Sequence, residues 1–264
     1  MAALELTRGG TMAGRFVVLG ASNVSRGLAR LATALRSRVA GPADLFVAAG
    51  HGRGYGVNTR VAWRRLPSIL ASGLWRALDR EAAAAPAALV TDVGNELLYG
   101  LGVTAVATAI REAVERLRDR GGRVAITGLP LASIAGVGAA RYRLMRTVYV
   151  PGCQLALGEL REAARWLDDE LRAIAADTGA TFIEQPGDWY GFDALHVRRS
   201  RLDELWERVG DAWGLPAATG RPQPSLAEWA VIGSRAAEVR SLAGRTLFTR
   251  QPVVARSGLR VWMY

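Results

Sequence analysis

The chain has 264 residues, half of them hydrophobic, and carries a formal net charge of +10. This length and hydrophobic content suffice for one large core. The basic residues are all arginines, so the chain lacks the lysine that a Walker A phosphate loop or Schiff-base chemistry needs, and its single cysteine excludes an intramolecular disulfide.

The positive charge does not by itself indicate a nucleic-acid partner. Arginines are spread along segments of helical periodicity, such as 111–120 and 199–210, where acidic neighbours at helical spacing favour ion-paired, solvated faces. No apolar stretch approaches the roughly 18 residues of a membrane span, and the run at 16–21 is too short for a signal-peptide core. We therefore expect a cytoplasmic protein without nucleic-acid or membrane partners, and leave its oligomeric state open.

Short apolar runs alternate with segments of helical period from about residue 15 to residue 213. This alternation is typical of a parallel sheet with helices on both faces. The predicted strands lie at 15–20, 44–50, 87–94, 123–130 and 180–186, and the predicted helices at 25–38, 67–83, 103–120, 157–178 and 200–213.

The remaining segments divide the chain. Residues 1–14 are interpreted as an N-terminal extension, 15–215 as the main domain, and 216–264 as a linker with a small C-terminal appendage. The appendage contains a short helix and two strand-like runs that are predicted to pair as a β-hairpin. The glycine-interrupted segment 130–152 has no clean period, and we expect it to form a long excursion at a pocket rim.

Glycine-rich or polar blocks follow four of the five predicted strands. In open parallel sheets, ligands bind beyond the carboxyl ends of the strands, where loops converge and helix N-termini point their free N–H groups outward. The four blocks are GASNVSRG at 20–27, GHGRGYG at 50–56, DVGNELLYG at 92–100 and DWYGFDALH at 188–196.

In their order and position these blocks resemble the SGNH or GDSL hydrolases. The resemblance covers roughly residues 15–213 and implies a flavodoxin-like, three-layer α/β/α sandwich with a five-stranded parallel sheet. It also implies a nucleophile at Ser22, activated by His196 and Asp193, and an oxyanion hole formed by the Ser22 N–H, a glycine after the second strand, and Asn95.

Three positions depart from the family pattern. Position 21 is Ala where an Asp is usual, and Glu96 replaces the Asp that follows Asn95. The family's register would place Arg53 at the oxyanion position, so Gly52 and Gly54 are both candidate donors, and we favour Gly52.

The residues themselves restrict the choice of general base. A serine hydroxyl needs a base within hydrogen-bond reach, and the chain has only two histidines, His51 and His196. Asp193 lies three residues before His196, a spacing that lets its carboxylate accept from the far ring nitrogen. His51 has no acidic neighbour in sequence and is interpreted as a wall or oxyanion-loop residue.

Further residues are candidates for substrate binding. An Arg53 side chain that points into the cleft would favour an ester with a nearby carboxylate or phosphate. Trp189 and Tyr190 are either core packing or a pocket wall beside the base, and Gly54 lies in the same loop as Arg53.

Together these features predict a serine hydrolase that cleaves an acyl or acetyl ester of a small molecule or carbohydrate through an acyl-enzyme, without metal or cofactor. Alternatives remain at this point. One is that Ser22 acts only as a helix N-cap, although Ser25 is better placed for that role. The rival functions are a non-catalytic binding protein on the same fold, an acyltransferase that uses the same residues, and a nucleic-acid-binding protein.

Overall fold

The computed structural model describes residues 14–81, 84–217 and 223–264. Residues 1–13, which make up nearly all of the predicted N-terminal extension, lie outside this part of the chain. The described residues form a seven-stranded sheet in the order β10, β11, β2, β1, β5, β6, β7. These strands are β1 (Gly14–Leu19), β2 (Ala43–Ala48), β5 (Ala87–Val90), β6 (Arg123–Thr127), β7 (Thr181–Ile183), β10 (Val254–Arg256) and β11 (Leu259–Met263).

The five predicted strands are β2, β1, β5, β6 and β7, and all of them are parallel. Numbered in chain order among themselves, they follow the sequence 2-1-3-4-5, which is the flavodoxin order. The side chains of β1 alternate between two cores: Phe16 and Val18 pack on one face of the sheet, and Val17 and Leu19 on the other. Both faces are buried, which explains the continuous apolar run in this strand.

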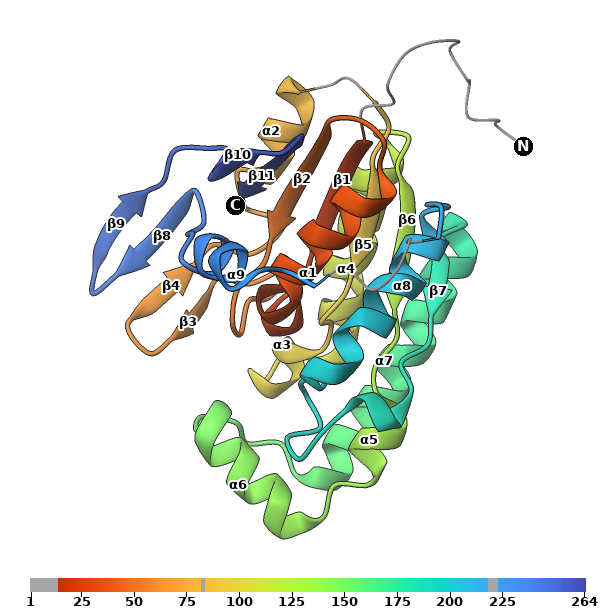
Figure 1. Cartoon of the computed structure of the whole chain (residues 1–264). Coiled ribbons are helices and arrows are strands. Elements are labelled where there is room, and N and C mark those ends of the chain that lie inside the picture. Colours follow the sequence, from red (N-terminus) through yellow and green to blue (C-terminus); the bar gives the residue numbers. More distant parts are fainter. Residues whose placement is uncertain (1–13, 82–83, 218–222) are drawn as a thin grey trace.

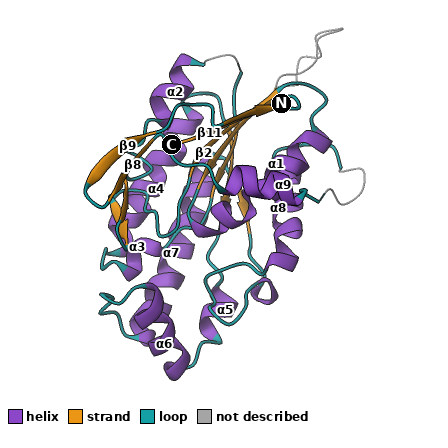
Figure 2. Cartoon of the chain, turned by 60° about the vertical axis from the view of Figure 1, so that its left-hand side comes forward, coloured by secondary structure: helices purple, strands orange, loops and turns teal. Residues whose placement is uncertain are grey.

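Helices cover both faces of the sheet (Figures 1 and 2). Residues of α2, α4 and α7 contribute to one core, and residues of α1, α8 and α9 to the other. The helices are α1 (Ser22–Arg38), α2 (Leu74–Arg80), α3 (Asn95–Leu98), α4 (Val103–Arg118), α5 (Leu131–Ala135), α6 (Ala139–Tyr149), α7 (Leu157–Thr178), α8 (Leu202–Ala212) and α9 (Leu226–Gly233).

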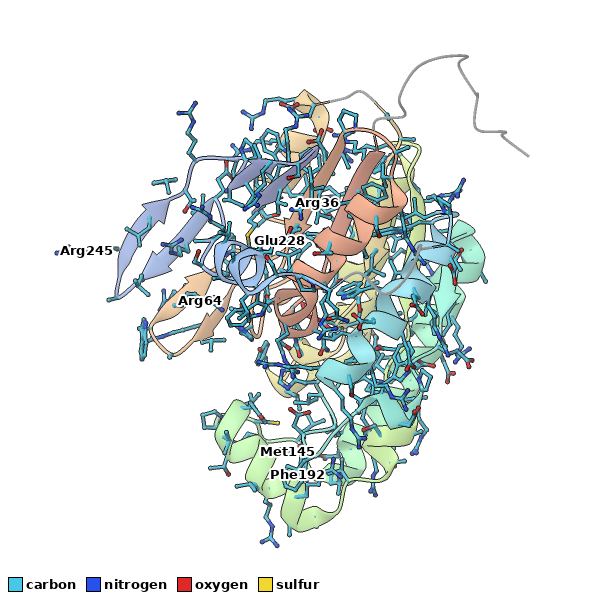
Figure 3. All side chains as sticks on the ribbon, in the orientation of Figure 1. Arg36, Arg64, Met145, Phe192, Glu228 and Arg245 are labelled. Atoms are coloured by element: carbon cyan, nitrogen blue, oxygen red, sulfur yellow. The ribbon has the colours of Figure 1, made fainter. Side chains whose placement is uncertain are left out.

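The predicted strand count of five is wrong, because the C-terminal segment extends the main sheet. Strand β11 pairs in parallel with β2, and β10 pairs antiparallel with β11. Helix α9 lies against α1, where Glu228 forms an ion pair with Arg36 (Figure 3). Val261 is fully buried in the core, so the burial of apolar side chains against β2 holds the segment on the sheet.

A second, four-stranded antiparallel sheet joins two distant parts of the chain. Its order is β3 (Thr59–Val61), β4 (Arg64–Leu66), β8 (Val239–Leu242) and β9 (Arg245–Phe248). Sequence periodicity missed the β3–β4 hairpin, and the helix predicted over 67–83 begins only at Leu74. The residues just before it instead make local turns, in which the Ser72 hydroxyl donates to the carbonyl of Ile69.

The excursion after β6 contains α5 and α6, which lie below the carboxyl ends of the strands in Figure 1. Helix α7 follows and ends at Gly179, whose φ of 66° is the left-handed conformation that a helix terminus favours in glycine. In the part of the chain that the structure describes, none of the helices has both the length and the apolar composition that a membrane crossing requires.

Candidate active site

One pocket lies at the carboxyl ends of the parallel strands and contains most of the predicted site. Ser22, Gly52, Asn95 and His196 line it, although they come from four separate segments of the chain. The space is about 1190 Å³ and is partly open to solvent. The structure therefore gathers the predicted nucleophile, base and oxyanion donors around a single cleft.

A carboxylate that the sequence analysis overlooked holds the turn that carries Ser22. Asp92, two residues after the end of β5, accepts hydrogen bonds from the main-chain N–H groups of Ala21 (2.8 Å), Asn23 (2.9 Å) and Val24 (3.2 Å). Among the described residues, the N–H of Ser22 has no acceptor. It thus remains available to an oxyanion at the N-terminus of α1, where the helix dipole favours negative charge.

Neither Ser22 nor Ser25 caps α1 with its side chain. The N-cap position is Ala21, and the Ser25 hydroxyl donates back to the carbonyl of Ala21 (3.0 Å). Since Asp92 caps the helix from outside, the Ser22 hydroxyl is not needed for capping.

Asn23 joins the turn that carries Ser22 (the serine turn) to the loop that carries His196 (the histidine loop). Its side-chain oxygen accepts from the N–H of Val197 (2.9 Å), and its amide nitrogen donates to Asp92 (2.8 Å) and to the carbonyl of Leu195 (3.1 Å). The bonds to Leu195 and Val197 connect residues more than 170 positions apart in sequence. They fix the main chain on both sides of His196 relative to the residue that follows Ser22.

Asp193 and His196 form the predicted pair. The Nδ1 atom of His196 lies 2.7 Å from Oδ2 of Asp193, and Oδ1 accepts from the N–H groups of Leu195 (3.1 Å) and His196 (2.9 Å). Burial alone would raise the pKa of Asp193, but the hydrogen bonds from the imidazole and the main chain outweigh it and lower the pKa to about 2. Asp193 is therefore a stable anion that orients the ring and leaves Nε2 for the pocket.

Ser22 and His196 share the pocket but are not yet hydrogen-bonded to each other. No bond between the serine hydroxyl and the imidazole occurs among the described residues. In unliganded hydrolases this contact often closes only when substrate binds.

The ring of Tyr149 from α6 packs edge-on against His196 at 5.7 Å between centroids, so α6 helps to place the imidazole.

Gly52 has a conformation and surroundings that require glycine. Its φ is 68°, and an added Cβ would lie 2.7 Å from both the Tyr99 hydroxyl and a methyl group of Val61. The Tyr99 hydroxyl donates to the carbonyl of Gly52 (2.7 Å), which fixes the peptide plane. The N–H of Gly52 has no acceptor within the described residues.

Gly54, the other candidate, lies against the Glu96 side chain on the side of the 50–56 loop that faces away from the pocket. It is buried and does not line the pocket, and an added Cβ would lie 2.9 Å from Oε1 of Glu96. The Glu96 carboxylate accepts from the N–H groups of Tyr55 and Gly56. Burial raises the pKa of Glu96 despite these bonds. Glu96 therefore anchors the 50–56 loop to α3 on the side away from the pocket.

The prediction that Arg53 points into the cleft is wrong. Its side chain is 1% exposed, and its guanidinium donates to the main-chain oxygens of Pro67 (3.0 Å), Ala49 and Tyr264. Burial, followed by the nearby charge of Arg64, lowers its pKa to about 9. Arg53 joins the 50–56 loop to the end of β11, so its charge is not available to an acidic substrate in the pocket.

The two aromatic candidates, Trp189 and Tyr190, lie in different places. Trp189 is 1% exposed, packs in the core and donates from Nε1 to Glu204 (3.0 Å), so it does not line the pocket. Tyr190 does line the pocket, and its hydroxyl donates to Gln185. His51 also lines the pocket; partial burial, followed by the nearby charge of Arg64, lowers its pKa.

Sequence reasoning missed Asp92 and Asn23. Both stand inside the polar blocks, Asp92 as the second residue after β5 and Asn23 directly after Ser22. Asp92 has a φ of 56°, which aspartate tolerates better than most residues and which turns the chain at the strand end. Its place at a strand exit was the available signal.

No protein-family model matches the chain, and no curated protein matches it. Solved structures do match. One is 14% identical with a TM-score of 0.52, covering 76% of this chain and 96% of its own. The psychrotrophic esterase EstA from Pseudoalteromonas sp. is 14% identical (75% and 96% covered, TM-score 0.47), and TesA is 14% identical (75% and 97% covered, TM-score 0.46). At this level of likeness the comparison concerns the fold alone.

Proposed function

We propose that this chain is a serine esterase that cleaves carboxylic esters through an acyl-enzyme. Ser22 is the nucleophile, His196 the general base and acid, and Asp193 the carboxylate that orients His196. The N–H groups of Ser22 and Gly52 and the amide of Asn95 are the oxyanion donors.

In the proposed reaction, the hydroxyl oxygen of Ser22 attacks the ester carbonyl while Nε2 of His196 takes its proton. The carbonyl oxygen becomes an anion held by the three donors, and the imidazolium then gives its proton to the departing alkoxide. Water enters, loses a proton to His196 and attacks the acyl-enzyme. Collapse of this second intermediate returns the proton to Ser22 and releases the carboxylic acid. This chemistry needs no metal or cofactor.

One observation carries the proposal. Residues from four strand exits line a single pocket, and within it the base is already bound to its orienting carboxylate at 2.7 Å. The free N–H groups of Ser22 and Gly52 support it further, since donors placed in advance stabilise an oxyanion without reorganisation.

The direct test is covalent labelling with a fluorophosphonate probe, which reacts only with an activated serine. We expect stoichiometric labelling of the wild-type protein, none of Ser22→Ala, and at least a 100-fold slower reaction for His196→Ala. Ser25→Ala is the matched control, because this hydroxyl lies one helical turn away and bonds only to its own helix. It should label like the wild type.

The same experiment separates the rival functions. A protein that only binds esters would not label at all, and equal labelling of Ser22→Ala and the wild type would place the reactive serine elsewhere. Product analysis in the presence of sugar alcohols distinguishes hydrolysis from acyl transfer, because transfer yields a new ester in place of the free acid.

A further inference from the structure

A second cavity adjoins the candidate active site, beneath α6. Its space is about 440 Å³, is partly open to solvent, and is lined by α5, α6, the first turn of α7 and the segment just before His196. Met145 of α6 and Phe192 of the histidine loop lie in this part of the molecule, although they are far apart in sequence (Figure 3). No residue of the proposed catalytic machinery lines this cavity, so that machinery gives it no role.

The walls of this cavity are apolar. Val137, Met145 and Ala194 are buried in a small core of their own, with Leu157 packed against them. The polar groups on the walls are engaged elsewhere: the Tyr142 hydroxyl donates to the carbonyl of Leu155 (2.8 Å), and the Arg146 guanidinium donates to the same carbonyl and lies over the Tyr142 ring. A space of this composition favours hydrocarbon over water.

The cavity and the catalytic pocket share walls. Leu98, Ile134 and Leu195 line both, and so do Tyr149, Val150 and Leu160. Leu195 directly precedes His196, and Tyr149 packs against the imidazole. The shared wall therefore runs beside His196, the proposed base.

We infer that the cavity beneath α6 binds a linear aliphatic chain of the ester substrate, which makes medium-chain esters the preferred class. The inference rests on the proposed function for its catalytic readout. Either side of the ester can supply such a chain, since the acyl group and the alcohol group flank the same reacting carbon.

Two ester series test the inference and separate these sources. One series combines ethanol with acids from acetate to decanoate, and the other combines acetate with alcohols from ethanol to decanol. We expect kcat/KM to rise about threefold to fourfold for each added methylene in one series, and to stop rising when the cavity is full. The series that rises identifies the chain, and a flat profile in both would contradict the inference.

Variants on adjacent positions of α6 give a matched comparison. Met145 is 7% exposed and lines the cavity, whereas Leu144 is 54% exposed and faces outward. Met145→Trp should fill the space. We compare kcat/KM for the six-carbon ester of the rising series with kcat/KM for ethyl acetate, and expect this variant to lower their ratio at least tenfold. Leu144→Trp should leave this ratio unchanged. Leu157→Phe is the second filling variant, for use if Met145→Trp fails to fold, and equal ratios in the filling and control variants would contradict the inference.

A binding measurement separates this inference from the proposed function. Octanoate and 1-octanol are titrated by calorimetry into Ser22→Ala, which cannot turn over an ester, and into the same variant carrying Leu157→Phe. We expect one of the two ligands to bind the first protein and to bind the second at least tenfold more weakly. If no ester is hydrolysed but this binding holds, the proposed function fails and the aliphatic site stands; if neither ligand binds, the aliphatic site is overturned.

Discussion

The two sides of the candidate active site are held in place in different ways. On the side of Ser22, Asp92 and Asn23 bind main-chain groups of the serine turn and the histidine loop, next to the pocket. On the side of Gly52, the 50–56 loop is held by the buried side chains of Glu96 and Arg53, neither of which lines the pocket.

This difference separates positioning from stability. The bonds of Asn23 set how the imidazole lies relative to the Ser22 hydroxyl, so their loss should act mainly on the chemical step. Arg53 joins the 50–56 loop to the carbonyls of Pro67 and Tyr264. Its loss should therefore act mainly on the stability of the folded state. Three predictions test this contrast.

The largest effect is expected from Asn23→Ala. The substitution removes the acceptor for the Val197 N–H and the donor to the Leu195 carbonyl, which lets the histidine loop shift against the serine turn. We expect kcat for ester hydrolysis to fall about 100-fold with little change in KM, because a displacement of about 1 Å is sufficient for such a loss. Steady-state kinetics and the free energy of unfolding are measured together; a fall in kcat that merely follows the folded fraction would contradict the positioning role.

A smaller effect, of the opposite kind, is expected from Arg53→Met. The variant keeps the aliphatic volume but leaves buried main-chain carbonyls without a donor, while it also relieves the burial of a charge. We expect the free energy of unfolding to fall by about 2 kcal/mol, with kcat of the folded protein within about threefold of the wild type. Arg143→Met, on an exposed face of α6, is the control and should leave the unfolding midpoint in urea unchanged.

The smallest effect concerns pH. The pKa of Asp193 is lowered from 3.8 to about 2 in the folded state, so its ionised form contributes stability that is present above pH 3.8 and is lost as the pH falls toward about 2. Asp193→Asn removes this contribution. The free energy of unfolding, measured with urea, should therefore decline less steeply between these two pH values in the variant than in the wild type. Parallel declines would show that the Asp193–His196 pair does not stabilise the fold.

Much of the architecture was predictable because it is local. The apolar runs of β1, β2, β5, β6 and β7 and the period of α4 and α7 are sequence patterns with a direct structural meaning, and Gly179 marks the end of α7 where a left-handed residue is needed. The choice of Ser22, Asp193 and His196 as candidates was also local, since it came from blocks at strand exits and from a spacing of three residues.

The tertiary structure decided how distant segments meet. A two-strand run such as 254–263 carries no signal that names its partner, so its addition to β2 rather than a separate hairpin depended on the open edge of the main sheet. The direction of the Arg53 side chain depended in the same way on carbonyls more than ten residues away, which burial made available as partners.

The sequence by itself thus determined the sheet and helix types, their order and the residues suited to ester chemistry, because periodicity, glycine positions and short spacings are properties of neighbouring residues. Only the tertiary structure decided that Asp92 and Asn23 hold the site together, that Gly52 rather than Gly54 lines the pocket, and that α6 encloses an apolar cavity beside His196. These features are made by contacts across tens to hundreds of residues, and such contacts form only when the folded core fixes both partners in space.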